Sequence, residues 1–384
     1  MKPTSYIELS KSALKNNLLF IREVIGEDPE LVSVVKGNAY GHGIDVFTKA
    51  AYDCGVRSFA VFSAHEAFHV AEANINFNRL IIMGSVDERD ELEWAIVNNV
   101  DFFVFDFERL MHALQIAKKH KAIIRIHIEL ETGMNRTGFK RAELKKLFPI
   151  LDTWSDYISV QGICSHLAGS ENISNYLRIK KQISRFSHVT KIFRSKNVAY
   201  GHPHLACSAA IMNYPKTILD MVRVGILQYG FWPSKEVKVA YLARTKATED
   251  PLKRVISWKS KVMDVKTAKA GEFIGYGSSY LAEADMKIAV VPVGYAHGFS
   301  RSLSNQGRVL IAGVRVSVIG VVNMNMVLVD VSNLKDVKKG DEVVLIGNQG
   351  DHSISVASFS DLSVQLNYEL LTRLPHDIPR IIID

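Results

Sequence analysis

One lysine stands where a buried strand is expected to end. An apolar run over residues 31–35 leads into Lys36, and small or turn-forming residues follow as far as Gly43. Partial desolvation lowers the pKa of an amine, and a neutral amine can form an imine with a carbonyl compound. Lys36 is therefore a candidate nucleophile; the alternative is a solvated lysine that closes a strand.

Further polar side chains stand near the ends of later apolar runs. They are two arginines, two histidines and a serine: Arg136, Arg223, His166, His204 and Ser208. Taken singly, each also has a structural explanation, namely a surface ion pair, a hydrogen-bonded core histidine or a helix N-cap. The segment His202-Pro203-His204 lacks a third metal ligand, so we expect no metal site.

The elements that would position these side chains alternate along the first two-thirds of the chain. The predicted strands are residues 31–35, 58–62, 80–84, 101–105, 123–130, 158–166, 204–207 and 222–229. The predicted helices are residues 44–52, 64–73, 88–98, 107–119, 141–151, 172–193 and 209–220. Eight strands that alternate with helices indicate an α/β fold with a closed (β/α)₈ barrel of the TIM type. Such a barrel places its site at the C-terminal ends of the strands, where these polar residues would converge.

An anion site is expected beside the lysine. Ser208 opens a predicted helix, and the backbone amides of Gly225 and Ile226 lie near the eighth predicted strand. Phosphate commonly binds after the last two strands of a barrel and at helix N-termini. An imine-forming lysine opposite a phosphate site indicates pyridoxal 5′-phosphate (PLP), which carries both an aldehyde and a phosphate.

The pattern changes near residue 240. The β-rich runs 255–266, 286–293, 308–311, 314–322, 327–331 and 341–347 follow one another without helices. They predict a mainly β C-terminal domain, with Ala312-Gly313 as a hairpin tip. We place the barrel in residues 1–243 and the β-rich domain in residues 244–384. The first strand, which lies within about the first ten residues of the chain, is expected to pair with the second domain.

Composition argues against several classes of protein. The 384 residues carry a formal charge of +7, but the basic residues are scattered, which argues against a nucleic-acid partner. Cys54, Cys164 and Cys207 have no paired spacing, which argues against a disulfide framework or a cysteine zinc site. We find no signal-peptide core and no apolar run near the roughly 20 residues that a membrane helix needs. The sequence therefore predicts a cytoplasmic protein without a membrane partner.

Seven motifs occur in the order known from one enzyme family. They are Val35-Lys36-Gly37-Asn38-Ala39-Tyr40-Gly41-His42-Gly43, Thr132-Gly133-Met134-Asn135-Arg136, Ser208-Ala209-Ala210, Asp220-Met221-Val222-Arg223-Val224-Gly225-Ile226, Tyr276-Gly277, Val293-Gly294-Tyr295-Ala296 and Asn367-Tyr368-Glu369. Through them the chain resembles bacterial alanine racemase, a PLP enzyme of fold-type III, from Ile7 to Arg380. The resemblance implies an isomerase that interconverts L- and D-alanine and supplies D-alanine for the peptidoglycan of the cell wall.

The resemblance also implies roles for individual residues. Lys36 would hold PLP covalently and act as one catalytic base, and Tyr276 of a partner subunit would be the second base. Arg223 would bond the pyridine nitrogen, held by His204, with His166 near the ring. Tyr40, Ser208, Gly225, Ile226 and Tyr368 would bind the phosphate. Arg136 would contact the phenolic oxygen of the cofactor and the substrate, Met324 would offer its N–H to the substrate carboxylate, and Tyr295 would line the entrance.

Two catalytic bases on opposite faces of the cofactor suit racemisation. One base removes the Cα proton, and the other delivers a proton from the far side. Because Tyr276 and Met324 would come from a second chain, the resemblance implies a homodimer with its active sites at the interface.

The chain departs from the family pattern in several places. Glu129 stands where many members carry a carbamylated lysine that orients Arg136, and its carboxylate would supply the same negative charge without modification. Asn323, Asn325 and Met326 replace the usual cysteine, aspartate and glutamine around Met324. Cys207 and His297 replace a common asparagine and aspartate. These changes lie near the expected substrate, so they concern specificity more than racemase chemistry.

Three other functions remain open at this point. The first is a fold-type III racemase of another small amino acid, such as serine. The second is a fold-type III decarboxylase of basic amino acids, which the Tyr276-Gly277 motif disfavours. The third is a PLP-binding regulatory protein; such proteins usually lack the β-rich domain that is expected here from residue 255 onward.

Overall fold

The computed structural model describes residues 3–356 and 367–384, without the side chains of residues 367 and 368. The chain forms two compact units. The barrel unit comprises Ser12–Gly37 and Thr48–Lys253, and the β-rich unit comprises Met1–Lys11, Asn38–Phe47 and Arg254–Asp384. Each unit is described below by itself.

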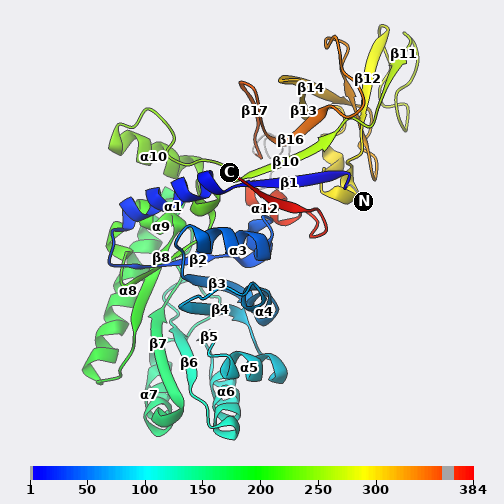
Figure 1. Cartoon of the computed structure of the whole chain (residues 1–384). Helices are drawn as coiled ribbons and strands as arrows, with labels where there is room; N and C mark the ends of the chain where they lie inside the picture. Colours follow the sequence, from blue (N-terminus) through cyan, green and yellow to red (C-terminus); the bar gives the residue numbers. More distant parts are fainter. Residues whose placement is uncertain (1–2, 357–366) are drawn as a thin grey trace. The chain divides into compact units, whose positions relative to one another are not determined.

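The barrel unit is built on a closed barrel of eight parallel strands (Figure 1). In barrel order they are β2 (Glu30–Val34), β3 (Ser58–Ser63), β4 (Arg79–Ser85), β5 (Asp101–Val104), β6 (Ile124–Glu129), β7 (Ile158–Cys164), β8 (His202–Cys207) and β9 (Met221–Val224). Pairing of Val32 in β2 with Arg223 in β9 closes the barrel. The predicted fold class, a TIM-type barrel followed by a mainly β domain, is confirmed.

Helices follow most of the strands, and several begin at sequence signals of the expected kind. Besides the short α2 (Lys36–Tyr40), the helices before residue 254 are α1 (Lys11–Ile25), α3 (Ile44–Asp53), α4 (Ala64–Glu72), α5 (Arg89–Val97), α6 (Phe107–His120), α7 (Leu144–Thr153), α8 (Tyr176–Ser195), α9 (Ser208–Asn213) and α10 (Lys235–Thr245). Asp106 caps α6 by accepting a hydrogen bond from the N–H of Arg109 at 2.9 Å. Within the described residues, no helix has the length and apolarity that a membrane span needs.

The last barrel strand is shorter than predicted. The expected strand 222–229 ends at Val224, and η5 (Ile226–Tyr229) is a 3₁₀ turn. Gln228 in this turn donates from Nε2 to the carbonyls of Val34 and Val224, both at 3.1 Å. These bonds fold the buried apolar run back against the barrel, which an apolar pattern alone does not distinguish from a strand. The predicted helix 209–220 likewise ends at Asn213, close to Pro215.

The β-rich unit contains a sheet of ten strands (Figure 1). Its order is β11 (Asp264–Ala268), β12 (Met286–Val291), β15 (Val327–Asp330), β14 (Val314–Ile319), β13 (Arg308–Ile311), β16 (Glu342–Gln349), β10 (Ile256–Lys261), β1 (Ser5–Ser10) and β18 (Arg380–Ile383), with β17 (His352–Ile354) paired to β16. The first strand of the chain thus lies between β10 and β18. The short helix α12 (Asn367–Thr372) completes the unit.

Two details of this sheet test the sequence predictions. The predicted run 255–266 is two strands, because the N–H of Val262 bonds to Asp341 and that of Met263 bonds to Val290, so the chain changes partners. The hairpin tip at Ala312-Gly313 is confirmed. Both residues have positive φ, +50° and +76°, as a two-residue turn of type I′ requires.

The backbone after Lys36 is left-handed. Gly37, Asn38, Ala39 and Tyr40 in the short turn α2 (Lys36–Tyr40) have φ of +62°, +53°, +52° and +53°. A left-handed residue other than glycine costs roughly 1–2 kcal/mol, so the surroundings must stabilise this turn. The Asn38 side chain accepts from the N–H of Ile44 at 2.8 Å. The His42 Nδ1 lies 3.0 and 3.1 Å from the carbonyls of Ala39 and Tyr40. The side chains of Asn38 and His42 thus stabilise the turn by bonding to nearby backbone groups.

Gly41, which follows this turn, has no room for a side chain. Its φ is +82°, and a Cβ would lie 1.9 Å from the Leu371 carbonyl oxygen. We expect Gly41→Ala to destabilise the protein by about 3 kcal/mol, from backbone strain and the clash together. Gly26→Ala is the matched control, because Gly26 has φ +81° but nothing within 4 Å of its Cβ position. Thermal unfolding midpoints should fall much further for Gly41→Ala; equal falls would contradict the clash.

Candidate active site

The barrel unit brings most of the predicted site residues to the C-terminal ends of its strands. Lys36 follows β2, Glu129 ends β6, His166 follows β7, and His204 and Arg223 lie within β8 and β9. The charges of Lys36, Arg136 and Arg223 all act on His166, which shows that these side chains are near one another. These predicted residues therefore form a spatial cluster and not only a set of strand ends.

Lys36 has the properties of a reactive amine. Burial, and next the positive charge of Arg136, lower the pKa of Lys36 below that of an ordinary lysine. The side chain is nevertheless exposed to solvent. The two observations agree for an amine in an open recess, where protein atoms replace part of the bulk water but leave a path of approach. No hydrogen bond or ion pair engages the Lys36 Nζ among the residues that the structure describes.

Glu66 fixes the backbone next to Lys36 and was not predicted. One carboxylate oxygen accepts from the N–H of Gly37 at 2.7 Å, and the other accepts from the N–H of Phe62 at 2.8 Å. The sequence held a signal for this residue, since Ser63 and Glu66 have the spacing of a capping box at the start of α4. The glutamate bonds to Phe62 and Gly37 and thereby ties the ends of β2 and β3 together.

Arg223 is buried and held by two neighbours. Its Nη1 contacts the His204 Nδ1 and lies 3.3 Å from the His204 carbonyl, and its Nη2 donates to the Ser165 carbonyl at 2.8 Å. The Nε of Arg223 donates no hydrogen bond within the described part of the chain. The Nε–H of a rigidly placed guanidinium is thus left for a ligand.

His166 is a neutral side chain beside these cations. Burial, and next the charge of Arg223, lower the pKa of His166 to about 3. Gln182 in α8 donates to the His166 carbonyl at 2.9 Å and accepts from the Ala168 N–H at 2.9 Å, which fixes the loop after β7. An uncharged imidazole can therefore lie beside an aromatic ligand without adding a further positive charge.

Glu129 is a buried carboxyl group of this cluster. The side chain is buried, and burial raises its pKa, whereas a hydrogen bond from Thr137 and the charge of Arg136 act in the opposite direction. Its carboxylate forms as the pH rises through this raised pKa. The charge of Arg136 acts on Glu129, so the two groups lie near each other, and the orienting role of Glu129 stays a prediction.

Glu129→Gln is expected to lower kcat/KM about tenfold or more by leaving Arg136 less well placed. Because the pKa of Glu129 is raised, the activity of the wild type should begin to fall, as the pH is lowered, at a higher pH than an ordinary glutamate would cause. The variant should not show this fall. Glu108→Gln, at an exposed glutamate of α6, is the control. Added bicarbonate should not rescue the variant, and bicarbonate-dependent activity of the wild type would contradict the role of Glu129.

Three of the residues expected to bind an anion, Ser208, Gly225 and Ile226, lie in connected segments. Ser208 does not cap a helix with its own hydroxyl; the Ser208 Oγ accepts from the N–H of Gly225 at 2.9 Å. This bond ties the segment after β8 to the segment after β9. Ile226 begins η5, and the first N–H groups of a helical turn have no partner within it. The Ser208 hydroxyl and the Ile226 amide can both face an anion there.

The remaining predicted residues belong to the β-rich unit. Tyr276, Met324 and Tyr295 are 72%, 56% and 42% exposed. The N–H of Tyr295 donates to the Asn323 carbonyl at 3.0 Å, and that of Ala296 donates to the Met324 carbonyl at 3.0 Å, so two predicted segments are adjacent. Tyr40 lies in the left-handed turn. The side chain of Tyr368 lies outside the described residues.

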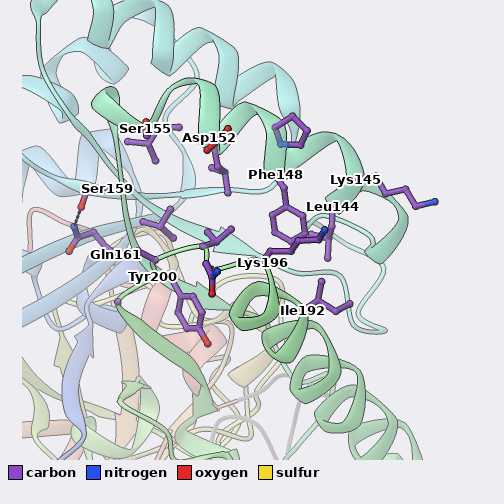
Figure 2. A pocket seen from close by; sticks show the side chains of 18 of the residues that line it. Leu144, Lys145, Phe148, Asp152, Ser155, Ser159, Gln161, Ile192, Lys196 and Tyr200 are labelled. Atoms are coloured by element: carbon purple, nitrogen blue, oxygen red, sulfur yellow. Dashed lines mark hydrogen bonds between the residues drawn. The ribbon is translucent and has the colours of Figure 1, made fainter.

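A hollow of about 1200 Å³ lies elsewhere on the barrel unit (Figure 2). Residues of α7, of the N-terminal half of β7 and of the segment after α8 line it, among them Phe148, Val160, Gln161, Lys196 and Tyr200. None of the predicted site residues is in its lining. It adjoins the N-terminal half of β7, away from the strand ends that carry the cluster.

Known proteins match the chain along almost its full length. The model of the alanine racemase N-terminal domain matches residues 9–233, and that of the alanine racemase C-terminal domain matches residues 255–382. The chain belongs to the alanine racemase family. A curated alanine racemase from Leptospira interrogans is 33% identical over 388 residues, which cover 100% of this chain and 97% of the relative. One from Methanococcus maripaludis is 32% identical and covers 98% of both chains.

Solved members of the family share the fold. The alanine racemase from Bacillus anthracis with bound L-Ala-P superposes with a TM-score of 0.89 and 30% identity, covering 100% of this chain and 96% of that one. The alanine racemase from Bartonella henselae, with covalently bound pyridoxal phosphate, has a TM-score of 0.82 and 25% identity over the whole of both chains. The alanine racemase family is PLP-dependent.

The residues of the barrel unit fit such a cofactor. An amine with a lowered pKa can hold the aldehyde, the open N–H of Arg223 can meet a ring nitrogen, and the Ser208 region can face a phosphate. A neutral His166 fits beside the ring. The barrel unit thus has a group for the aldehyde, for the ring nitrogen, for the phosphate and for the ring face of PLP.

Proposed function

We propose that this protein interconverts L- and D-alanine with PLP held by Lys36. Its membership in the alanine racemase family supports the reaction. The observation that carries the proposal is the amine of Lys36, which has a lowered pKa and lies in one cluster with His166, Arg136 and the fixed Arg223. A solvated lysine that merely closes a strand would have no such environment.

The side chains of this protein would then do the proton transfers. Bound PLP withdraws electrons from the Cα of an attached amino acid and makes its proton removable. Lys36 Nζ would remove or return that proton on one face, and the hydroxyl of Tyr276 from the partner subunit would do so on the other. Arg223 remains charged and can only donate, so it would keep the ring nitrogen unprotonated and limit side reactions such as transamination.

The other residues would bind and orient. Arg136, supported by Glu129, would contact the phenolic oxygen of PLP and the substrate. The phosphate would be bound by Tyr40, Ser208, Gly225, Ile226 and Tyr368. The Met324 N–H of the partner subunit would receive the substrate carboxylate, and Tyr295 would line the entrance. These roles rest on the family resemblance and, except for that of Tyr368, on the local geometry described above.

The proposal includes a homodimer. The hydroxyl of Tyr276 has no hydrogen-bond partner in the part of the chain that the structure describes, and the side chain is largely exposed. Phe273, Leu281 and Met324 of the same unit are apolar and exposed as well. Exposed apolar side chains of this size are typical of an interface between subunits. We further propose that the enzyme is cytoplasmic and that its D-alanine enters peptidoglycan.

One experiment tests the proposal directly. Purified protein is supplied with PLP, its visible absorbance is recorded, and the optical rotation of L-alanine is followed with time. We expect a band from lysine-bound PLP and loss of rotation to a racemic mixture. Protein that neither takes up PLP nor racemises alanine, nor exchanges its Cα hydrogen in D₂O, would contradict the proposal and favour a regulatory role.

Specific residues make serine a second candidate substrate. Asn323, Asn325 and Met326 flank Met324, and Cys207 lies 3.4 Å from the Ser170 hydroxyl, as measured from Sγ to Oγ. Asn323 places an amide where the family usually has a cysteine, and a polar side chain near a substrate suits a hydroxyl-bearing amino acid such as serine. We expect kcat/KM for alanine to exceed that for serine, and a higher value for serine would reassign the substrate. Release of CO₂ from lysine or arginine would instead indicate a decarboxylase.

A further inference from the structure

A line of buried polar side chains leads from Arg223 through the inside of the barrel. Beyond His204, whose Nδ1 contacts Arg223, the His204 Nε2 lies 2.9 Å from the His127 Nδ1. The His127 Nε2 lies 3.1 Å from Asp101 Oδ2. Both histidines are fully buried, and Asp101 is 1% exposed. Burying so many polar groups is costly unless every one is paired, and the roles proposed above use neither His127 nor Asp101.

The far end of this line is an anchored carboxylate. Arg79 Nη1 donates to Asp101 Oδ2 at 2.5 Å, and Arg125 Nε donates to Asp101 Oδ1 at 2.6 Å. Both arginines also donate to Gln161 Oε1 at 3.2 Å, and the Gln161 Nε2 donates to Ser159 Oγ at 2.7 Å (Figure 2). Burial acts to raise the pKa of Asp101, but the hydrogen bond and charges of its neighbours lower it on balance. Asp101 is therefore ionised at neutral pH.

An ionised carboxylate at one end dictates the direction of every bond in the line. A carboxylate only accepts, so the His127 Nε2 must carry a proton. Burial lowers the pKa of His127, which is therefore neutral and presents an accepting Nδ1. The His204 Nε2 must then donate to it. Burial lowers the pKa of His204 as well, so its Nδ1 is a bare acceptor, which suits Arg223 because a guanidinium only donates.

We propose that Asp101 and His127 are positioning residues that select the Nε2–H tautomer of His204 and thereby hold Arg223 in place for the cofactor. The proposal rests on the proposed function for its view that Arg223 meets the cofactor. Without an acceptor at His127, His204 could carry its proton on Nδ1 and present an N–H to the N–H of Arg223. Two facing donors repel, and Arg223 would move. An aspartate selects a histidine tautomer by the same principle in the catalytic triad of serine proteases.

The histidine tautomers can be measured without any reaction. In protein labelled with ¹⁵N-histidine, two-bond ¹⁵N–¹H spectra separate an N–H from a bare ring nitrogen. We expect both His127 and His204 of the wild type to carry the proton on Nε2, with and without PLP, between about pH 6 and 8. A proton on Nδ1 of either residue would overturn the proposal. This readout requires no variant to fold.

Two matched variants separate positioning from packing. His127→Leu removes the acceptor, whereas His127→Gln offers an amide oxygen to the His204 Nε2. We expect His127→Leu to mix the His204 tautomers, to shift the absorbance of bound PLP and to lower kcat about tenfold with little change in KM. His127→Gln should keep the wild-type tautomer and most of kcat. Equal losses in both variants with unchanged His204 tautomers would show a structural role only and overturn the proposal.

Failure of the proposed function would be seen separately. If the wild type has the expected tautomers but does not racemise alanine, the inference about Asp101 and His127 is upheld and the proposed substrate is wrong. If the wild type racemises alanine while His204 carries its proton on Nδ1, the reaction stands and this inference fails.

Discussion

Lys36→Ala is expected to abolish racemisation, with kcat lowered by at least about 10⁴-fold. One side chain would supply both the covalent attachment of PLP and one of the two bases, and no other amine shares its environment in the described cluster. Loss of the residue therefore removes two functions together. The measurement is the rate at which purified variant loaded with PLP converts L-alanine to D-alanine.

The control for this variant is Lys191→Ala, at an exposed lysine of α8, which should retain full activity. Borohydride reduction gives an independent readout, because it converts the imine between lysine and PLP into a stable secondary amine. The wild type should then carry PLP on the peptide that contains Lys36, and Lys36→Ala should carry none. PLP fixed on another lysine, or a variant with more than about a hundredth of wild-type kcat, would contradict the role of Lys36.

Tyr276→Phe is expected to lower kcat about 10³-fold in both directions while PLP stays bound. The change deletes only a hydroxyl, which makes no hydrogen bond within the described residues, so the fold should be unaffected. In D₂O the variant should still exchange the Cα hydrogen of one enantiomer, because Lys36 remains on its face of the cofactor. It should lose the exchange of the other enantiomer, whose proton faces Tyr276.

Tyr280→Phe is the matched control, because Tyr280 lies four residues further along the same segment and packs against buried side chains. It should keep activity within about twofold. Equal loss of exchange from both enantiomers in Tyr276→Phe, or no loss from either, would rule out a second base at this position.

Much of the barrel could be predicted because its strands are buried on both faces. Short apolar runs such as β3 and β5 stand out between amphipathic segments. Lys36 and His166 follow two further runs, β2 and β7, and Arg223 lies within β9. The motifs around these residues then allowed the family to be named before the fold was known. The chemistry could be predicted because it is concentrated at the strand ends.

Other features depend on the three-dimensional partners of a residue. Nothing in the pattern shows that Ile226 turns away from β9, since the bonds of Gln228 to Val34 and Val224 decide it. The left-handed turn after Lys36 needs His42 and Asn38 to stabilise it. Only glycine adopts such a backbone readily, and Asn38, Ala39 and Tyr40 are not glycines. The sequence therefore did not predict the turn.

The sequence already indicated that the buried line from Asp101 to Arg223 would need polar partners. Asp101 and His127 are polar residues inside otherwise apolar strands, and a buried polar group needs a partner. The sequence cannot say which partner, because strands β5, β6 and β8 bring together residues up to 103 positions apart, from Asp101 to His204. Pairing across a barrel becomes visible only in the fold.

We propose that each active site combines Lys36 of one subunit with Tyr276 of the other, and co-expression of two inactive variants tests this arrangement. Dimers that pair Lys36→Ala with Tyr276→Phe would contain one damaged site and one site with both residues intact. Random pairing should therefore restore about a quarter of the wild-type rate of alanine racemisation. No recovery from co-purified mixed dimers, although each variant folds and the wild type is active, would contradict the shared site.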